Sequence, residues 1–78
     1  MKVEKLKLKD FLGNDIYIMQ AVVFADSEYG NGYYLKNGYV VGETENFIKI
    51  MSKDGFGKDV VRKKASDKVV KVYENRSL

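Results

Sequence analysis

Short apolar runs alternate along this chain with clusters of glycine, asparagine and aspartate. One run, residues 15–25, reads DIYIMQAVVFA and is apolar on both faces, which is typical of a strand in a barrel wall. The chain has no proline, so its turns must be made by glycine, asparagine and aspartate, which adopt or tolerate positive φ. Such turn signals stand at residues 13–15, 30–32, 37–38 and 54–57.

The runs between these signals predict further short strands. We expect one at residues 33–35 and one at 39–44, on either side of an Asn37-Gly38 turn. The next strands are predicted at residues 47–51, 59–64 and 68–73. Residues 45–46 form a tight connection, and residues 65–67 form a junction short enough for one helical turn.

The segment at residues 3–12 fits two patterns. Leu6 and Leu8 alternate with lysines, as in an edge strand, whereas Leu8, Phe11 and Leu12 fit a short helical face. We favour a strand followed by a turn, and leave a short N-terminal helix or 3-10 turn as the alternative.

Five or six short strands with glycine turns predict an all-β domain that spans residues 1–78. A chain of 78 residues cannot fill a sandwich of two full sheets, so we expect a small SH3-like, Sm-like or OB-type barrel. Gly42 supports a barrel, because a wall of this size needs a sharp bend in mid-strand.

Positive charge gathers toward the C-terminal end of the chain. The net charge is +3. Residues 58–71 carry two acids, Asp59 and Asp67, against a larger group of cations: Lys58, Arg62, Lys63, Lys64, Lys68 and Lys71. If these cations share one outward side, they form a surface that attracts polyanions. The alternative is a solvated face that protects the sheet edges.

The composition argues against catalysis and against a bound cofactor. The chain has neither histidine nor cysteine, so the commonest general base, the best nucleophile and the usual zinc ligands are missing. Glu43 and Glu45 are two residues apart, and we interpret them as exposed acids flanking a turn. We predict no enzyme activity, no metal site and no cofactor.

No membrane or export segment is predicted. The apolar stretch at residues 21–25 is too short to cross a bilayer, and the first residues do not resemble a signal peptide. We therefore expect a cytoplasmic location.

Aromatic side chains divide into expected core and expected contact residues. Phe24 and Phe47 lie in apolar runs and are predicted to be buried. Phe56 stands between two glycines at a loop tip and is predicted to be exposed. Tyrosines beside the glycine turns can stack on bases or anchor a protein partner; they are Tyr29, Tyr33, Tyr34 and Tyr39.

Residues 34–73 resemble the Sm-like (Hfq-type) family of small β-barrel proteins. The first similar motif runs from Tyr34 through Asn37-Gly38, Gly42 and Glu45 into the strand that begins at Phe47. The second is a valine-rich strand with a basic group, residues 60–66, followed by Val69-Val70. The resemblance implies binding of single-stranded RNA by a ring of subunits. In such a ring Arg62, Lys63 and Lys64 would contact phosphate groups, and Phe47 or a loop tyrosine would stack on a base.

Two functional hypotheses follow. The first is a non-enzymatic nucleic-acid-binding module for RNA or single-stranded DNA. It takes its phosphate contacts from the cations of residues 58–71 and its stacking contacts from Tyr39, Phe47 and Phe56. The second is a protein-interaction module, an adaptor or a phage-type inhibitor, anchored by Tyr29, Tyr33, Tyr34 and Tyr39. Self-association is left open under both hypotheses.

Overall fold

The computed structural model describes residues 4–27, 32 and 34–72, and these residues form an all-β fold. In chain order its elements are β1 (Lys5–Lys9), β2 (Asp15–Tyr17), β3 (Ala21–Asp26), β4 (Tyr34–Glu43), β5 (Ile48–Lys53), β6 (Asp59–Lys64), the 3-10 helix η1 (Ser66–Lys68) and β7 (Val69–Lys71). The all-β prediction is confirmed, and the favoured strand at the N-terminal segment is present as β1. No helix in the described part of the chain has the length and apolar character needed to span a membrane.

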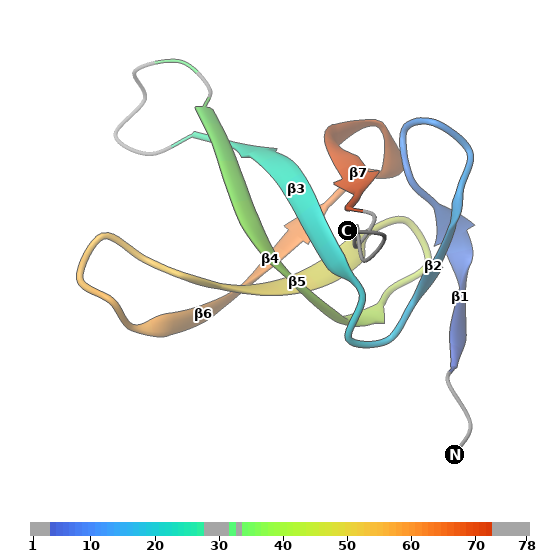
Figure 1. Ribbon diagram of the computed structural model, residues 1–78, viewed down its shortest axis with the longest axis horizontal. Coiled ribbons are helices and arrows are strands. Elements are labelled where there is room, and N and C mark those ends of the chain that lie inside the picture. Colours follow the sequence, from blue (N-terminus) through green and yellow to red (C-terminus); the bar gives the residue numbers. More distant parts are fainter. Residues whose placement is uncertain (1–3, 28–31, 33, 73–78) are drawn as a thin grey trace, which may run out of the picture.

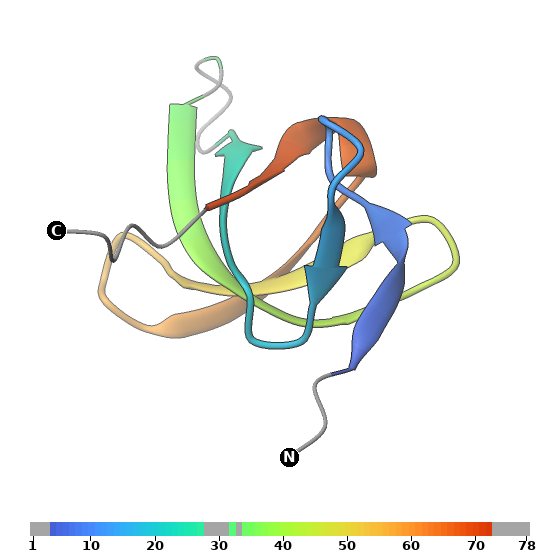
Figure 2. The ribbon, with the colours of Figure 1, turned by 45° about the vertical axis from the view of Figure 1, so that its right-hand side comes forward.

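The strands form two antiparallel sheets. β1 pairs with β2, and the other five strands follow the order β6-β5-β4-β3-β7. Strands β3 to β6 are a meander, after which η1 carries the chain to β7 at the opposite edge (Figure 1). Figure 2 shows how strongly the five-stranded sheet curls. In the described residues β6 and β7 do not pair, so the sheet is not closed and the predicted barrel is not confirmed.

The bend in β4 comes from a β-bulge at the predicted place. Val40 pairs with Ile50 and Gly42 pairs with Lys49, so β4 has one more residue than β5 between these pairs. A bulge of this kind bends the strand and increases its twist. Gly42 therefore lies at the bend, as the sequence indicated.

Asn37-Gly38 is not a turn, and this prediction was wrong. Both residues lie inside β4, where Asn37 pairs with Val23 and Gly38 pairs with Val22. A Cβ atom on Gly38 would lie 2.5 Å from the carbonyl oxygen of Met51. Gly38 is thus required for the close approach of β4 to β5, a packing role that its sequence neighbourhood does not distinguish from a turn.

The apolar run at residues 15–25 is not one strand either. It is interrupted between β2 and β3, where Met19 adopts a positive φ of 71°. The backbone N–H of Met19 donates to the carbonyl of Val40 at 2.7 Å, and the N–H of Val40 donates to the carbonyl of Gln20 at 3.0 Å. These bonds to β4 hold the chain in the reversal that starts β3.

The core lies between the inner face of the curled sheet and the β1–β2 hairpin. Its buried members come from both sheets: Leu6, Ile16, Val22, Phe24, Val40, Ile48, Ile50 and Val69. Phe24 is buried as predicted, but Phe47 is 43% exposed, so its predicted burial was wrong. Phe47 precedes β5, and Ile48 takes the inward position. A shift of one residue along a strand exchanges the two faces.

Two carboxylates attach the β1–β2 hairpin to the main sheet. Buried Asp10 accepts hydrogen bonds from the backbone N–H groups of Leu12, Asn14 and Lys71. Burial alone would raise the pKa of Asp10, but these hydrogen bonds outweigh it and hold the pKa below its ordinary value. At the other side of the hairpin, Glu43 of β4 accepts the backbone N–H groups of β1, from Lys7 at 2.9 Å and from Leu8 at 3.1 Å. The Glu43 carboxylate is thus a structural group rather than half of an exposed pair.

Candidate functional site

The two faces of the five-stranded sheet differ in what they bury. Alternate residues of a strand point to opposite faces. The inner face carries the core, so the residues between the core positions form the outer face. On this outer face a single row of directly paired residues crosses four strands: Ala21 pairs with Tyr39, Tyr39 with Met51, and Met51 with Val61. All four members of this row are apolar or aromatic.

Large side chains of the outer face remain open to solvent. Tyr39 is 55% exposed, Val61 50% and Met51 37%. Leu35, on the same face of β4, is 74% exposed. A cluster of exposed apolar side chains on one face is the usual mark of an interaction site.

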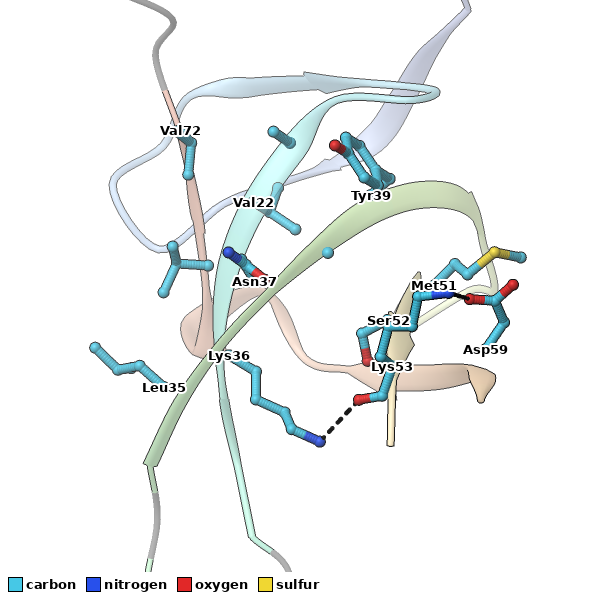
Figure 3. Close-up of a pocket in the computed structure, with 13 residues that line it drawn as sticks. Val22, Leu35, Lys36, Asn37, Tyr39, Met51, Ser52, Lys53, Asp59 and Val72 are labelled. Atoms are coloured by element: carbon cyan, nitrogen blue, oxygen red, sulfur yellow. Dashed lines mark hydrogen bonds and ion pairs between the residues drawn. The ribbon is translucent and has the colours of Figure 1, made fainter. Parts of the chain in front are cut away.

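This face is hollowed into a groove of about 840 Å³, which we call the outer groove. Figure 3 shows β4 crossing it, with Tyr39, Asn37 and Leu35 on one side and Met51, Lys53 and Asp59 on the other. The lining also includes half-buried residues of β3 and the residue after β7, namely Ala21, Val23 and Val72. Its other members belong to the inward-facing positions of the same strands: Val22, Lys36, Gly38 and Ser52. Val61 extends the same apolar row beyond the groove onto β6.

Lysines flank the apolar row on the outer face. Lys49 and Lys63 are directly opposite each other in the β5–β6 pair. Like charges in this arrangement repel, and an anionic group placed between them relieves the repulsion. On the other side of the row, Lys53 forms an ion pair with Asp59, with Nζ 2.7 Å from Oδ1. Among the described residues of the paired strands β5 and β6, the outer face therefore carries three lysines against one carboxylate.

On the inner face, beyond the apolar core, charged residues meet around Asp26. Lys64 Nζ lies 2.8 Å from Asp26 Oδ1, and Lys36 Nζ and Arg62 Nε lie 3.6 and 3.8 Å from Oδ2. We call these four residues the Asp26 cluster. β3 and β6 are separated in the sheet by β5 and β4. The contacts of Arg62 and Lys64 with Asp26 therefore cross the inside of the curl and join strands that share no backbone hydrogen bonds, whereas Lys36 reaches Asp26 from the adjacent strand β4.

The Asp26 side chain is only 3% exposed, yet it stays ionised. Burial alone would raise its pKa, but the hydrogen bond from Lys64, the backbone N–H of Ser27 and the charges of Lys64 and Arg62 outweigh burial. The pKa of Asp26 is therefore lower than that of an isolated aspartate.

The structure does not gather the predicted phosphate-binding cations on one side. Arg62 and Lys64 point inward to Asp26, whereas Lys63, which lies between them on β6, belongs to the outer face. Lys58 is exposed beside the β5–β6 turn, and Lys68 is exposed on η1. Lys71 is half-buried, with its Nζ 5.8 Å from the centre of the Tyr17 ring. The alternation of side chains along a strand is the physical reason for this separation.

The predicted aromatic contacts lie in three separate places. Tyr39 is in the outer groove, Phe47 is at the connection between β4 and β5, and Phe56 is 87% exposed at the tip of the β5–β6 hairpin, as predicted. Tyr34 is also exposed, but it pairs with Asp26 and so belongs to the opposite face from Tyr39. Tyr29 and Tyr33 lie outside the described residues.

Sequence reasoning missed the aliphatic part of the outer face. Leu35, Met51 and Val61 are not predicted as contact residues from the sequence, because the sequence of a single strand does not show which of its faces is covered. Alternation from Tyr39 does point to Leu35 on the same face, but the partners on β5 and β6 depend on register.

Among the described residues, no three histidine, cysteine or carboxylate side chains come together to hold a metal ion.

Comparison with known proteins gives a family without an assigned activity. Neither the curated proteins nor the solved structures contain a match, and nothing links the chain to the Sm-like family, so that resemblance stays a prediction. A family model described as "Domain of unknown function (DUF7205)" matches residues 8–72. The match includes β3 to β7 in full, and with them the outer groove and the Asp26 cluster. The chain therefore belongs to the DUF7205 family of domains of unknown function.

Proposed function

We propose that this domain is a protein-interaction module and that its outer groove binds a protein surface with an apolar centre and a carboxylate rim. The observation that carries the proposal is the exposed row formed by Tyr39, Met51 and Val61 across three neighbouring strands. Their burial against a partner would remove from water the side chains that the fold leaves open.

The side chains of the row favour protein over nucleic acid. Bases stack on aromatic rings, and Tyr39 is the one aromatic member of the row that it forms with Ala21, Met51 and Val61. Leu35, Met51 and Val61 offer aliphatic and thioether contacts, which match the apolar side chains of another protein. A central aromatic anchor surrounded by such groups is typical of protein interfaces.

The charges identify the chemistry of the partner. Lys49, Lys53 and Lys63 face one carboxylate, Asp59, on this surface. If the partner were a second copy of this chain, its outer face would bring three more lysines and only one more carboxylate to the interface. A partner with aspartate or glutamate around its apolar contacts would instead complement the lysines. We therefore commit to an acidic protein partner.

The fold proposal concerns the barrel type. We propose that the five-stranded sheet is an open form of a small SH3-like or Sm-like barrel. The strand order and the position of η1 between β6 and β7 support it. Nucleic-acid binding, self-association and a cytoplasmic location stay predictions from the sequence.

Selection of a displayed random-peptide library against the nuclease-treated domain tests the proposal. We expect peptides with apolar and aromatic residues flanked by aspartate or glutamate. Tyr39→Ala should weaken their binding about 30-fold, as for the loss of a central aromatic anchor. Phe56→Ala is the matched control, because it also removes an exposed ring, but from the hairpin tip. Its affinity should match that of the wild type.

Mapping of the selected peptides by NMR then decides the site. Chemical-shift changes should centre on Tyr39, Met51 and Val61. The proposal is wrong if the peptides map to the Phe56 hairpin, or if Tyr39→Ala binds as well as Phe56→Ala. It is also wrong if the untreated domain purifies with stoichiometric nucleic acid that competes with the peptides.

A further inference from the structure

We infer that the Asp26 cluster is a binding site for a phosphate group on the inner face of the sheet; Lys36 and Ser52 also line the outer groove, but the inference does not rest on the function proposed above. The site centres on Arg62 and Lys64, which belong to the same face of β6. The chemical class of its ligand is inorganic phosphate or a terminal phosphomonoester.

The first argument is charge. Arg62 and Lys64 both face the single carboxylate of Asp26, which also lies within 4.0 Å of Lys36. One carboxylate cannot neutralise both β6 cations, whatever further contact Lys36 makes. Partly buried positive charge without a counter-charge is costly. Of the other carboxylates in the described residues, Asp54 is close enough for Lys36 and Arg62 to contribute to its lowered pKa. Asp54 therefore adds counter-charge at a distance, but among the described residues it forms no ion pair within 4.0 Å with Arg62 or Lys64.

The second argument is unused hydrogen-bonding capacity. Arg62 Nε is buried and makes no hydrogen bond, since its 3.8 Å separation from Asp26 Oδ2 is too long for one. The hydroxyl of Ser52 is likewise buried without a partner. Ser52 faces the inside of β5 and is diagonal to Arg62, because Ile50 is the residue paired with Arg62. Asp26 Oδ2 is also buried without a hydrogen bond, so it does not satisfy either donor. Buried polar groups are normally satisfied, and the two donors therefore point to a further acceptor.

The third argument is access and geometry. The Arg62 side chain is 36% exposed, whereas Asp26 is 3% exposed. An anion can therefore reach the guanidinium from solvent while Asp26 stays behind the cations and holds them in place. Donors from an arginine, a lysine and a serine on two strands suit the several oxygens of a tetrahedral phosphate better than a planar carboxylate.

Titration of the ¹⁵N-labelled full chain with inorganic phosphate at constant ionic strength tests this inference. We expect saturable shifts of the Arg62 Nε–H signal and of the backbone amides around residues 62 and 64. Acetate at the same ionic strength should not reproduce them. A second titration with adenosine 5′-monophosphate distinguishes the two ligand types. If it binds more tightly than inorganic phosphate, the ligand is a phosphomonoester; if it binds more weakly, the ligand is the free phosphate ion.

Two neighbouring lysines supply the matched control. Lys64→Gln removes a cluster cation, and Lys63→Gln makes the same change on the opposite face of β6. Lys64→Gln should weaken phosphate binding about tenfold, as for the loss of one charge-assisted hydrogen bond, while Lys63→Gln should stay within about twofold of wild type. If Lys64→Gln does not fold, Arg62→Lys takes its place, because it keeps the charge but removes the guanidinium fork. Equal effects of the two lysine variants, unchanged binding by Arg62→Lys, or no saturable shift at millimolar phosphate would overturn the inference.

Discussion

Gly38→Ala should destabilise the domain, although alanine is ordinarily better than glycine inside a strand. The new Cβ atom would lie 2.5 Å from the carbonyl oxygen of Met51 and 2.7 Å from Cγ2 of Ile50. The first is a backbone atom of the neighbouring strand and the second belongs to a fully buried core residue, so neither can move aside freely. The two strands must separate locally to admit the methyl group.

The expected loss follows from two opposing terms. Overpacking of this kind costs about 1–3 kcal/mol, and two rigid neighbours place this site at the upper end of that range. The reduced entropy of the unfolded chain returns about 0.4–1 kcal/mol. The free energy of unfolding should therefore fall by about 2 kcal/mol, which in a domain of this size lowers the melting temperature by about 8–16 °C.

Gly42→Ala is the control in the same strand. Its Cβ would meet only the end of the Lys49 side chain, at 3.9 Å from Cδ. This variant should keep wild-type stability or gain up to about 1 kcal/mol. Urea titrations and thermal melts followed by circular dichroism measure both variants. If Gly38→Ala is as stable as Gly42→Ala, the close approach of β4 to β5 that we describe is wrong.

Two further predictions concern the attachment of the β1–β2 hairpin. Asp10→Ala leaves four N–H donors without their carboxylate and should cost about 3 kcal/mol in urea unfolding. Burial would raise the pKa of folded Asp10, but these donors outweigh it and lower the pKa. The contribution of Asp10 to the free energy of unfolding is therefore complete above the unfolded pKa of about 3.9, and it is lost as the pH falls through the lower folded pKa. A pH series should therefore show a smaller acid-dependent loss of stability in Asp10→Ala, and equal pH profiles would contradict this. Glu43→Gln should speed amide hydrogen exchange at Lys7 and Leu8, whereas Glu45→Gln should not; equal exchange in both variants would remove the role given to Glu43.

Local signals predicted several of the strands and most of the connections from sequence, but not the break between β2 and β3 or the continuity of β4. The Asp54–Gly57 turn, the tight connection at residues 45–46 and the helical turn after β6 all lie where the residues indicated. Each depends on a few neighbouring residues, such as Asp54, whose carboxylate accepts two backbone N–H groups of its own turn. Asn37-Gly38 carries an equally good local signal, but its pairing with β3 and the close approach of Gly38 to β5 override it.

The candidate site could be predicted only in part, because it depends on register between strands. Alternation along β6 already implies that Arg62 and Lys64 share a face and that Lys63 does not. Alternation does not tell which face of β6 turns inward. Arginine and lysine side chains usually face solvent, so the sequence alone would place both on the exposed face. The inward position is explained by Asp26 of β3, which is 36 residues before Arg62 in sequence. Such distant pairs carry no local signal.

The central claim is that one register places Tyr39, Met51 and Val61 side by side on the outer face while Arg62 and Lys64 turn inward to Asp26. A nuclear Overhauser spectrum of the labelled domain in solution tests this register most directly. It should contain contacts from the Tyr39 ring to the Met51 methyl group and from that methyl group to those of Val61. Contacts from the Tyr39 ring to Ile50, or the short-range pattern of a turn at Asn37-Gly38, would contradict the register and remove the outer groove with it.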